Sequence, residues 1–178
     1  MKNKFFEKYY KDMFNCVESY EEKKIIEISE KLKKLGKKNK VIIAGNGGSA
    51  SIAAHTAVDL TKISKIRSIT FNEPNLITCF ANDYGYENWL SKSIEEYMFE
   101  GDICILISSS GKSKNIINAA KACKKKNNFL ITLSGFESTN PLRKLGDINL
   151  WVNSKTYNFI EMAHHIWLVS ISDFIKKN

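Results

Sequence analysis

The sequence predicts an α/β fold, a three-layer αβα sandwich around a five-stranded parallel sheet. Short apolar segments such as 41–44 and 103–107 alternate with longer segments of helical periodicity. The apolar segments do not alternate with polar residues, which indicates strands buried on both faces of a parallel sheet covered by helices. Two of these strands run directly into polar loops, GNGGS at 45–49 and SSSGKS at 108–113. Ligands bind at such strand ends in this class of fold.

Residues 4–35 are predicted to form one long amphipathic helix. Apolar side chains from Phe5 through Val17 to Leu32 recur every three or four residues, and Gly36 follows as a helix stop. A helix of this kind either packs against a partner subunit or covers its own sheet. We assign residues 1–178 to a single domain, with 1–36 as an N-terminal oligomerisation helix and 37–178 as the α/β core.

The remaining elements follow from the same periodicities. Strands are expected at 41–44, 68–71, 103–107, 129–133 and 148–152. Helices are expected at 49–63, 75–81, 87–98, 115–126 and 157–176. The segment 82–85, Asn-Asp-Tyr-Gly, is typical of a turn.

Both polar loops have features of a phosphate site. A strand that breaks at Gly45 and re-enters a helix at Ser49 directs free N–H groups and the positive end of the helix dipole at one point. The second loop adds the hydroxyls of 108–110 and of Ser113. Either loop alone is also compatible with a plain turn, and the first lacks the lysine of a Walker loop and the G-x-G-x-x-G spacing of a dinucleotide fold. Together, at equivalent strand ends, they predict a sugar-phosphate pocket.

Two predicted helices each carry a carboxylate and an imidazole four residues apart. The pairs are His55 with Asp59 and Glu161 with His165. Positions four apart differ by only about 40° around a helix and therefore share a face, whereas His164 is turned about 60° the other way. Mixed imidazole and carboxylate donors suit zinc. The same pairs are also compatible with proton transfer or with structural polar contacts.

The composition indicates an ordered cytoplasmic protein. The chain is 43% hydrophobic, and its four cysteines are scattered without a C-x-x-C pair, as expected for free thiols in a reducing compartment. The charged N-terminus does not resemble a signal peptide, and no apolar run is long enough for a membrane span. The net charge of +8 suits nucleic acid or phosphorylated metabolites, but lysine clusters are common on solvated faces.

A resemblance to a known family rests on four segments, GNGGSASIAAHTAVDLT, FANDYGYENW, ISSSGKSKNIINAAKAC and FIEMAHHIWLVSISDFI. In this order they resemble the sugar-isomerase (SIS) domain and, within it, the phosphoheptose isomerase family, over nearly the whole chain. The resemblance implies a homotetramer with active sites between subunits. It also implies conversion of sedoheptulose 7-phosphate to D-glycero-D-manno-heptose 7-phosphate, for lipopolysaccharide, capsule or S-layer sugars, and one Zn²⁺ per subunit as in zinc-bearing members.

The resemblance also implies roles for individual residues. Substrate contacts are expected from Asn46, Gly47, Gly48, Ser49, Asn82, Asp83, Ser108, Ser109, Ser110 and Ser113. His55 matches a metal-ligand position of the zinc-bearing members.

Three positions depart from the family pattern. Asp59 stands where members carry a proton-transferring Glu, Glu161 where they carry Gln, and Val169 where they carry a second His. Val169 can neither bind a metal nor move a proton, but His165 lies one turn nearer on roughly the same face and could restore the imidazole. We therefore expect catalytic roles for Asp59, Glu161 and His165, substrate contacts for Asp59 and Glu161 as well, and a metal set of these three with His55.

The favoured function is a ketose–aldose isomerase that moves a proton between C1 and C2 of a phosphorylated heptose through an enediol. The alternative is a non-catalytic SIS-domain protein, either an adaptor that binds the bacterial replication initiator or a sugar-phosphate sensor, which the loss of His at Val169 favours. Direct nucleic-acid binding ranks third. The charge favours it, but the sequence carries no helix-turn-helix, zinc-finger or RNA-binding signature.

Overall fold

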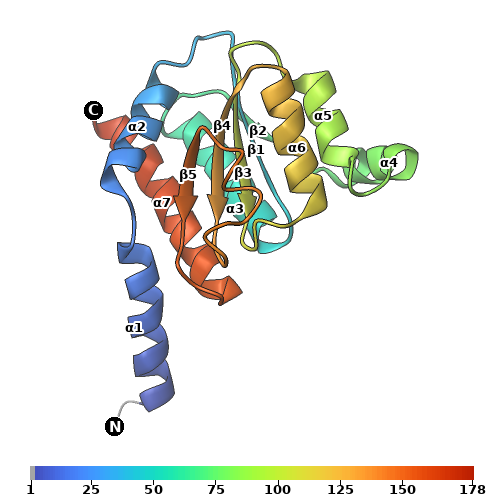
Figure 1. The fold of residues 1–178 in the computed structure, drawn as a ribbon. Coiled ribbons are helices and arrows are strands. Elements are labelled where there is room, and N and C mark those ends of the chain that lie inside the picture. The colour runs from blue at the N-terminus through green and yellow to red at the C-terminus, as the bar shows by residue number, and fades with distance from the viewer. Residues whose placement is uncertain (1–2) are drawn as a thin grey trace.

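The computed structural model describes residues 3–178 and confirms the αβα sandwich (Figure 1). Five parallel strands form one sheet in the order β2-β1-β3-β4-β5. The strands are β1 (Val41–Gly45), β2 (Ser68–Thr70), β3 (Ile103–Ser108), β4 (Phe129–Ser134) and β5 (Ile148–Trp151). The helices are α1 (Lys4–Glu18), α2 (Glu22–Lys33), α3 (Gly48–Lys62), α4 (Pro74–Tyr84), α5 (Trp89–Tyr97), α6 (Lys114–Lys125) and α7 (Tyr157–Lys177).

Two hydrophobic cores lie on the two faces of the sheet. Alternate strand residues point to opposite faces, so that Ile43 and Ile105 join one core while Ile42 and Leu106 join the other. Helices α2, α3 and α7 cover the first face, and α4, α5 and α6 cover the second (Figure 1). Burial on both faces explains why the strands read as continuous apolar runs.

The predicted helix over 4–35 is wrong in one respect, because the chain breaks between α1 and α2. Helix α1 ends at Glu18, and the Ser19 hydroxyl donates to the carbonyl of Cys16 at 2.7 Å. The carbonyl of Val17 accepts from Trp167 Nε1 of α7 at 2.8 Å instead of continuing a helical ladder. The contact with α7 therefore accompanies the end of α1. The sequence does not reveal this break, because the apolar periodicity continues through it.

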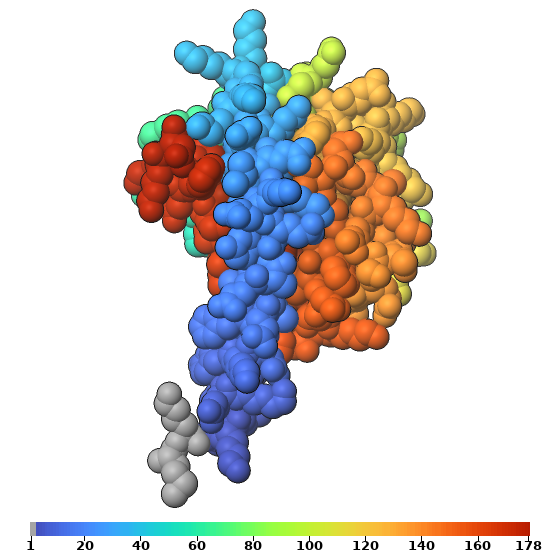
Figure 2. Space-filling model, turned by 60° about the vertical axis from the view of Figure 1, so that its left-hand side comes forward, coloured from blue at the N-terminus to red at the C-terminus, as the bar shows by residue number. Residues whose placement is uncertain are grey.

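Helix α1 extends beyond the sandwich with an aromatic face in solvent. Figure 2 shows it projecting from the body at the end opposite the α2–β1 connection. Its inner side packs on α7, where the rings of Tyr9 and Phe159 lie 4.9 Å apart. The outer aromatic side chains, all more than half exposed, are Phe5, Phe6, Tyr10 and Phe14. Over residues 3–178, no helix has the length and apolar content needed to cross a membrane.

Candidate active site

The carboxyl ends of β1 and β3 form a small polar cavity. These strands are hydrogen-bonded neighbours, with Gly45 opposite Ile107, so the loops that follow them meet. The cavity has a volume of about 120 Å³ and is lined by Asn46, Ser49, Ile107, Ser108, Ser109, Ser110, Ser113, Tyr157 and Glu161. This lining contains no lysine or arginine. An anion here would be held by hydroxyl and backbone N–H donors.

The serine hydroxyls of this cavity are largely buried. Ser49, Ser108 and Ser109 are each at most 5% exposed. Ser108 donates to Ser113 at 3.2 Å, which ties the start of the loop to the cap of α6. The hydroxyl of Ser109 is buried without a hydrogen-bond partner in the described part of the chain. A buried hydroxyl left unpaired costs about 1–3 kcal/mol, which a ligand oxygen in the cavity would relieve.

Two glycines shape the first loop. Gly47 has a φ of +54°, a conformation that a side chain disfavours, and it precedes the first turn of α3. The N–H groups of Gly48 and Ser49 in that turn have no acceptor within their own helix. A Cβ on Gly48 would lie 2.7 Å from Cδ of Glu161. The missing side chain therefore lets the Glu161 carboxylate reach the cavity wall.

An imidazole pair bridges α3 and α7. Nε2 of His165 lies 3.0 Å from Nδ1 of His55, and Nε2 of His55 lies 3.2 Å from Oδ2 of Asp59. The Asp59 carboxylate beside Nε2 of His55 favours the tautomer that carries its proton there, which leaves Nδ1 to accept a hydrogen bond from His165. Burial, and then the neighbouring His55, lower the pKa of His165 below its ordinary value. The lowered pKa favours the neutral form of His165, which lies one helix turn along α7 from Glu161.

His164 takes no part in this pair. It is fully buried, and its Nε2 lies 3.1 Å from the carbonyl of Ser134. Burial lowers its pKa to about 4, so the ring stays neutral and donates that hydrogen bond. His164 is a core residue beneath the end of β4, as its angular position on α7 predicts.

The structure does not gather the four expected metal ligands into one cluster. His55, Asp59 and His165 form the chain of contacts described above, whereas Glu161 lines the serine cavity. Within residues 3–178, no three His, Cys, Asp or Glu side chains are arranged to hold a metal ion. The two facing ring nitrogens are suitable zinc donors in type, but a tetrahedral site needs further ligands. Zinc therefore does not fit the described chain as a complete site.

Asn82 and Asp83 also lie apart from the serine cavity. The predicted turn is wrong here, because α4 starts at Pro74 and runs to Tyr84, and Gly85 with a φ of +81° ends it. Both residues are exposed in its last turn, and Asn82 donates to Asp83 at 3.1 Å. The prediction failed because the residue types that favour turns, such as Asn, Asp and Gly, also occur at the ends of helices.

Sequence reasoning missed a residue that supports the serine loop from behind. Asn140 is buried, and its amide donates to the carbonyls of Gly135 and Glu137 at 3.2 and 2.9 Å. Gly111, with a φ of +64°, lies so close to Asn140 that a Cβ would meet its side chain. The Asn140–Pro141 pair indicates a turn in the sequence, but nothing local shows which loop this turn supports.

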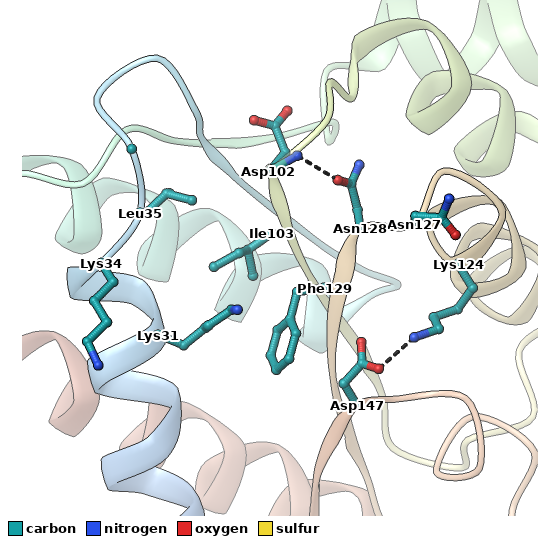
Figure 3. A pocket seen from close by; sticks show the side chains of 12 residues that line it. Lys31, Lys34, Leu35, Asp102, Ile103, Lys124, Asn127, Asn128, Phe129 and Asp147 are labelled. Carbon is teal, nitrogen blue, oxygen red and sulfur yellow. Dashed lines mark hydrogen bonds and ion pairs between the residues drawn. The ribbon is translucent and has the colours of Figure 1, made fainter.

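A larger cavity of about 500 Å³ lies at the opposite, amino ends of β3 and β4 (Figure 3). Lys31 lies 4.6 Å from the ring centre of Phe129, and Lys124 pairs with Asp147 at 2.6 Å. Lysines also occupy the last turns of α2, α3, α6 and α7. Cations there offset the negative ends of these helix dipoles. Part of the net charge thus has a structural role far from the serine cavity.

Comparison with known proteins identifies the family of the chain. A family model described as "SIS domain" matches residues 5–135. The phosphoheptose isomerase of Fusobacterium nucleatum is 34% identical in an alignment of 168 residues that covers 90% of this chain and 86% of that protein. The phosphoheptose isomerase of Sulfurimonas denitrificans is 36% identical in an alignment of 175 residues that covers 89% of this chain and 86% of that protein.

Solved structures show the same fold. The phosphoheptose isomerase from Neisseria gonorrhoeae superposes with a TM-score of 0.89 at 24% identity, covering 97% of each chain. The enzyme from Francisella tularensis gives a TM-score of 0.87 at 23% identity, again over 97% of each chain. Because the family model and these relatives match most of its length, the chain belongs to the SIS-domain sugar isomerases and, within them, to the phosphoheptose isomerase family.

Proposed function

We propose that this sugar-phosphate isomerase interconverts sedoheptulose 7-phosphate and D-glycero-D-manno-heptose 7-phosphate. The choice of a heptose rests on the names of its relatives. The observation that carries the proposal is the placement of a hydroxyl-lined cavity without lysine or arginine one helix turn from the imidazole pair of α3 and α7. Glu161 at the cavity and His165 at the pair are one turn apart, a rise of about 6 Å along the helix. An extended sugar with its phosphate in the cavity would bring its other end toward the imidazoles.

Phosphate binding would come from the two loops. Ser49, Ser109 and Ser110 offer hydroxyls, and the first turn of α3 offers N–H groups with the positive end of the helix dipole. Such fixed donors hold a dianion and orient the sugar relative to the acid–base groups. The lining holds no lysine or arginine and its one charged residue is Glu161, so the phosphate would be held by hydrogen bonds and not by pairing with a cation.

The proposed chemistry is proton transfer between C1 and C2. A base removes a proton from C1 while an acid protonates the C2 carbonyl oxygen, which gives an enediol. Return of a proton to C2 and loss of the O1 proton give the aldehyde, so no proton is gained or lost overall. Neutral His165 and the Glu161 carboxylate are the groups we assign to these transfers, and Asp59 orients His55 behind His165.

Zinc has no assigned step in this proposal. His55 Nδ1 and His165 Nε2 are the donors that a metal would use, and Asp59 would then support His55 through its other nitrogen. The remaining ligands would have to come from outside the described contacts. Metal analysis of the purified protein, with activity measured before and after chelation, tests this point.

We also propose that the protein is a cytoplasmic homotetramer, with residues 1–36 as an oligomerisation segment. The four exposed aromatic side chains of α1 form an apolar surface that a second copy would cover. The free thiols of Cys16, Cys79, Cys104 and Cys123 suit a reducing compartment. Sedimentation should show a tetramer that Phe14→Asp dissociates. A wild-type monomer at micromolar concentration would refute the assembly.

The alternative is a non-catalytic adaptor or sugar-phosphate sensor. The replacement of an imidazole by Val169 favours it, whereas the His55–His165 contact favours catalysis. Incubation with sedoheptulose 7-phosphate and a panel of ketose phosphates, with and without zinc, followed by NMR of the anomeric region, separates the two. New aldose signals support the isomerase. Tight binding of a sugar phosphate without any new signal supports the sensor.

A further inference from the structure

The side chains of Asn46 and Asn115 bond to one another in both directions. Nδ2 of Asn46 donates to Oδ1 of Asn115 at 2.9 Å, and Nδ2 of Asn115 donates to Oδ1 of Asn46 at 2.8 Å. Asn46 belongs to the loop after β1, and Asn115 to the first turn of α6, directly after the serine loop. The pair therefore joins the two loops that form the cavity.

The Asn46–Asn115 pair is largely buried and lies between two cavities. Asn115 is only 3% exposed. Asn46 and Ser113 line both the 120 Å³ serine cavity and a neighbouring cavity of about 490 Å³, which Asn115 also lines. The joined carboxamides thus form part of the wall between the serine cavity and this wider space.

The Asn46 carboxamide has one of its two N–H donors left for a ligand. Its Nδ2 and Oδ1 both bond to Asn115, and Oδ1 also accepts from the hydroxyl of Tyr86 at 3.4 Å. The side chain that the sequence assigns to substrate therefore also joins two loops of the protein. The residues that follow present backbone N–H groups and the Ser49 hydroxyl to a phosphate.

We propose that Asn115 is a positioning residue, which acts through Asn46 to fix the first loop against the serine loop. This inference rests on the proposed function, because it assumes that the cavity binds the phosphate of a sugar. Gly47 and Gly48 have the greatest backbone freedom of any residue type, and ordering them on binding would cost affinity. Two reciprocal hydrogen bonds fix that loop in advance, so the donors are already placed when the phosphate arrives.

The test is a double-mutant cycle on phosphate affinity and turnover. We expect Asn115→Ala to raise KM for the sugar phosphate and Kd for inorganic phosphate about tenfold, as the loss of two hydrogen bonds predicts, with little change in kcat. Asn46→Ala should cause a similar loss. The double variant should be no worse than either single variant, because both remove the same contact. Losses that multiply, or an unchanged KM in Asn115→Ala, would overturn the proposal.

Two further variants separate positioning from folding. Asn115→Asp keeps the size of the side chain but cannot donate to Asn46, so it should lose affinity as Asn115→Ala does and serves if the alanine variant fails to fold. Asn118→Ala is the matched control. It removes a carboxamide of α6 that bonds to the Glu87 carbonyl and the Asn88 side chain, at 3.0 and 3.2 Å, and should leave KM unchanged.

Inorganic phosphate separates this inference from the proposed function. A wild-type protein that binds phosphate without isomerising sugars would refute the reaction, while the phosphate affinities of the variants would still decide the role of Asn115. A wild-type protein that binds neither phosphate nor sugar phosphate would refute both.

Discussion

Replacing Gly48 with alanine should displace the Glu161 carboxylate without unfolding the protein. The added Cβ would lie 2.7 Å from Cδ of Glu161. Carbon atoms in ordinary contact are about 3.5–4.0 Å apart, so the carboxyl group must retreat by about 1 Å. It sits at the end of a flexible side chain and can move into the cavity mouth at little cost. Gly48 is also the first residue of α3, where alanine is a better helix former than glycine.

The expected consequence is a loss of turnover with little loss of stability. Misplacing an acid–base group by about 1 Å can lower the rate about 100-fold, and we expect kcat to fall by that order. The midpoint of thermal unfolding should change by less than about 4 °C, which corresponds to about 1 kcal/mol in a domain of this size. Phosphate affinity should change less than kcat, because the serine hydroxyls are untouched.

The assay compares kcat in Gly48→Ala, Glu161→Ala and the double variant. Once Glu161 is truncated the added methyl group meets no carboxylate, so Gly48→Ala should cost nothing further in that background. Full activity in Gly48→Ala alone would refute the assigned role of the Glu161 carboxylate. An additional loss in the double variant would show that the methyl group acts on the phosphate loop instead.

Three further predictions concern single side chains. Ser110→Ala removes a hydroxyl donor from the cavity and should raise KM by the equivalent of about 1 kcal/mol; unchanged sugar-phosphate binding in calorimetry would exclude this residue from the site. His165→Ala should abolish isomerisation while leaving phosphate affinity intact, and retained activity would transfer the acid–base role to Glu161 or His55. Because folding lowers the pKa of His164 from 6.5 to about 4, the unfolded chain takes up that proton first on acidification. The free energy of unfolding should therefore be highest above pH 6.5 and lose about 3 kcal/mol between pH 6.5 and pH 4. Urea unfolding against pH in wild type and His164→Gln measures this loss, which should be smaller in the variant.

The order of elements and the parallel sheet follow from the sequence alone. Apolar runs buried on both faces and helices between them are local patterns, and chirality and connection rules leave few ways to assemble them. The two strand-end loops can also be predicted from neighbouring residues, because glycine and serine after a strand favour a turn followed by a helix start wherever the strand lies in the sheet. The i, i+4 spacing likewise decides that Glu161 and His165 share a face of α7, while His164 turns toward the core.

Contacts between distant segments decided the rest. The break after Glu18 depends on Trp167, which lies about 150 residues away and takes a carbonyl that the helix would otherwise use. The separation of Glu161 from the imidazole pair depends on how α7 lies across the first turn of α3, where Gly48 leaves room for a carboxylate. The bond between Asn46 and Asn115 depends on β1 and β3 being neighbours in the sheet. Periodicity fixes the direction in which a side chain points along its own element, but which atoms it meets is fixed only when the elements pack together.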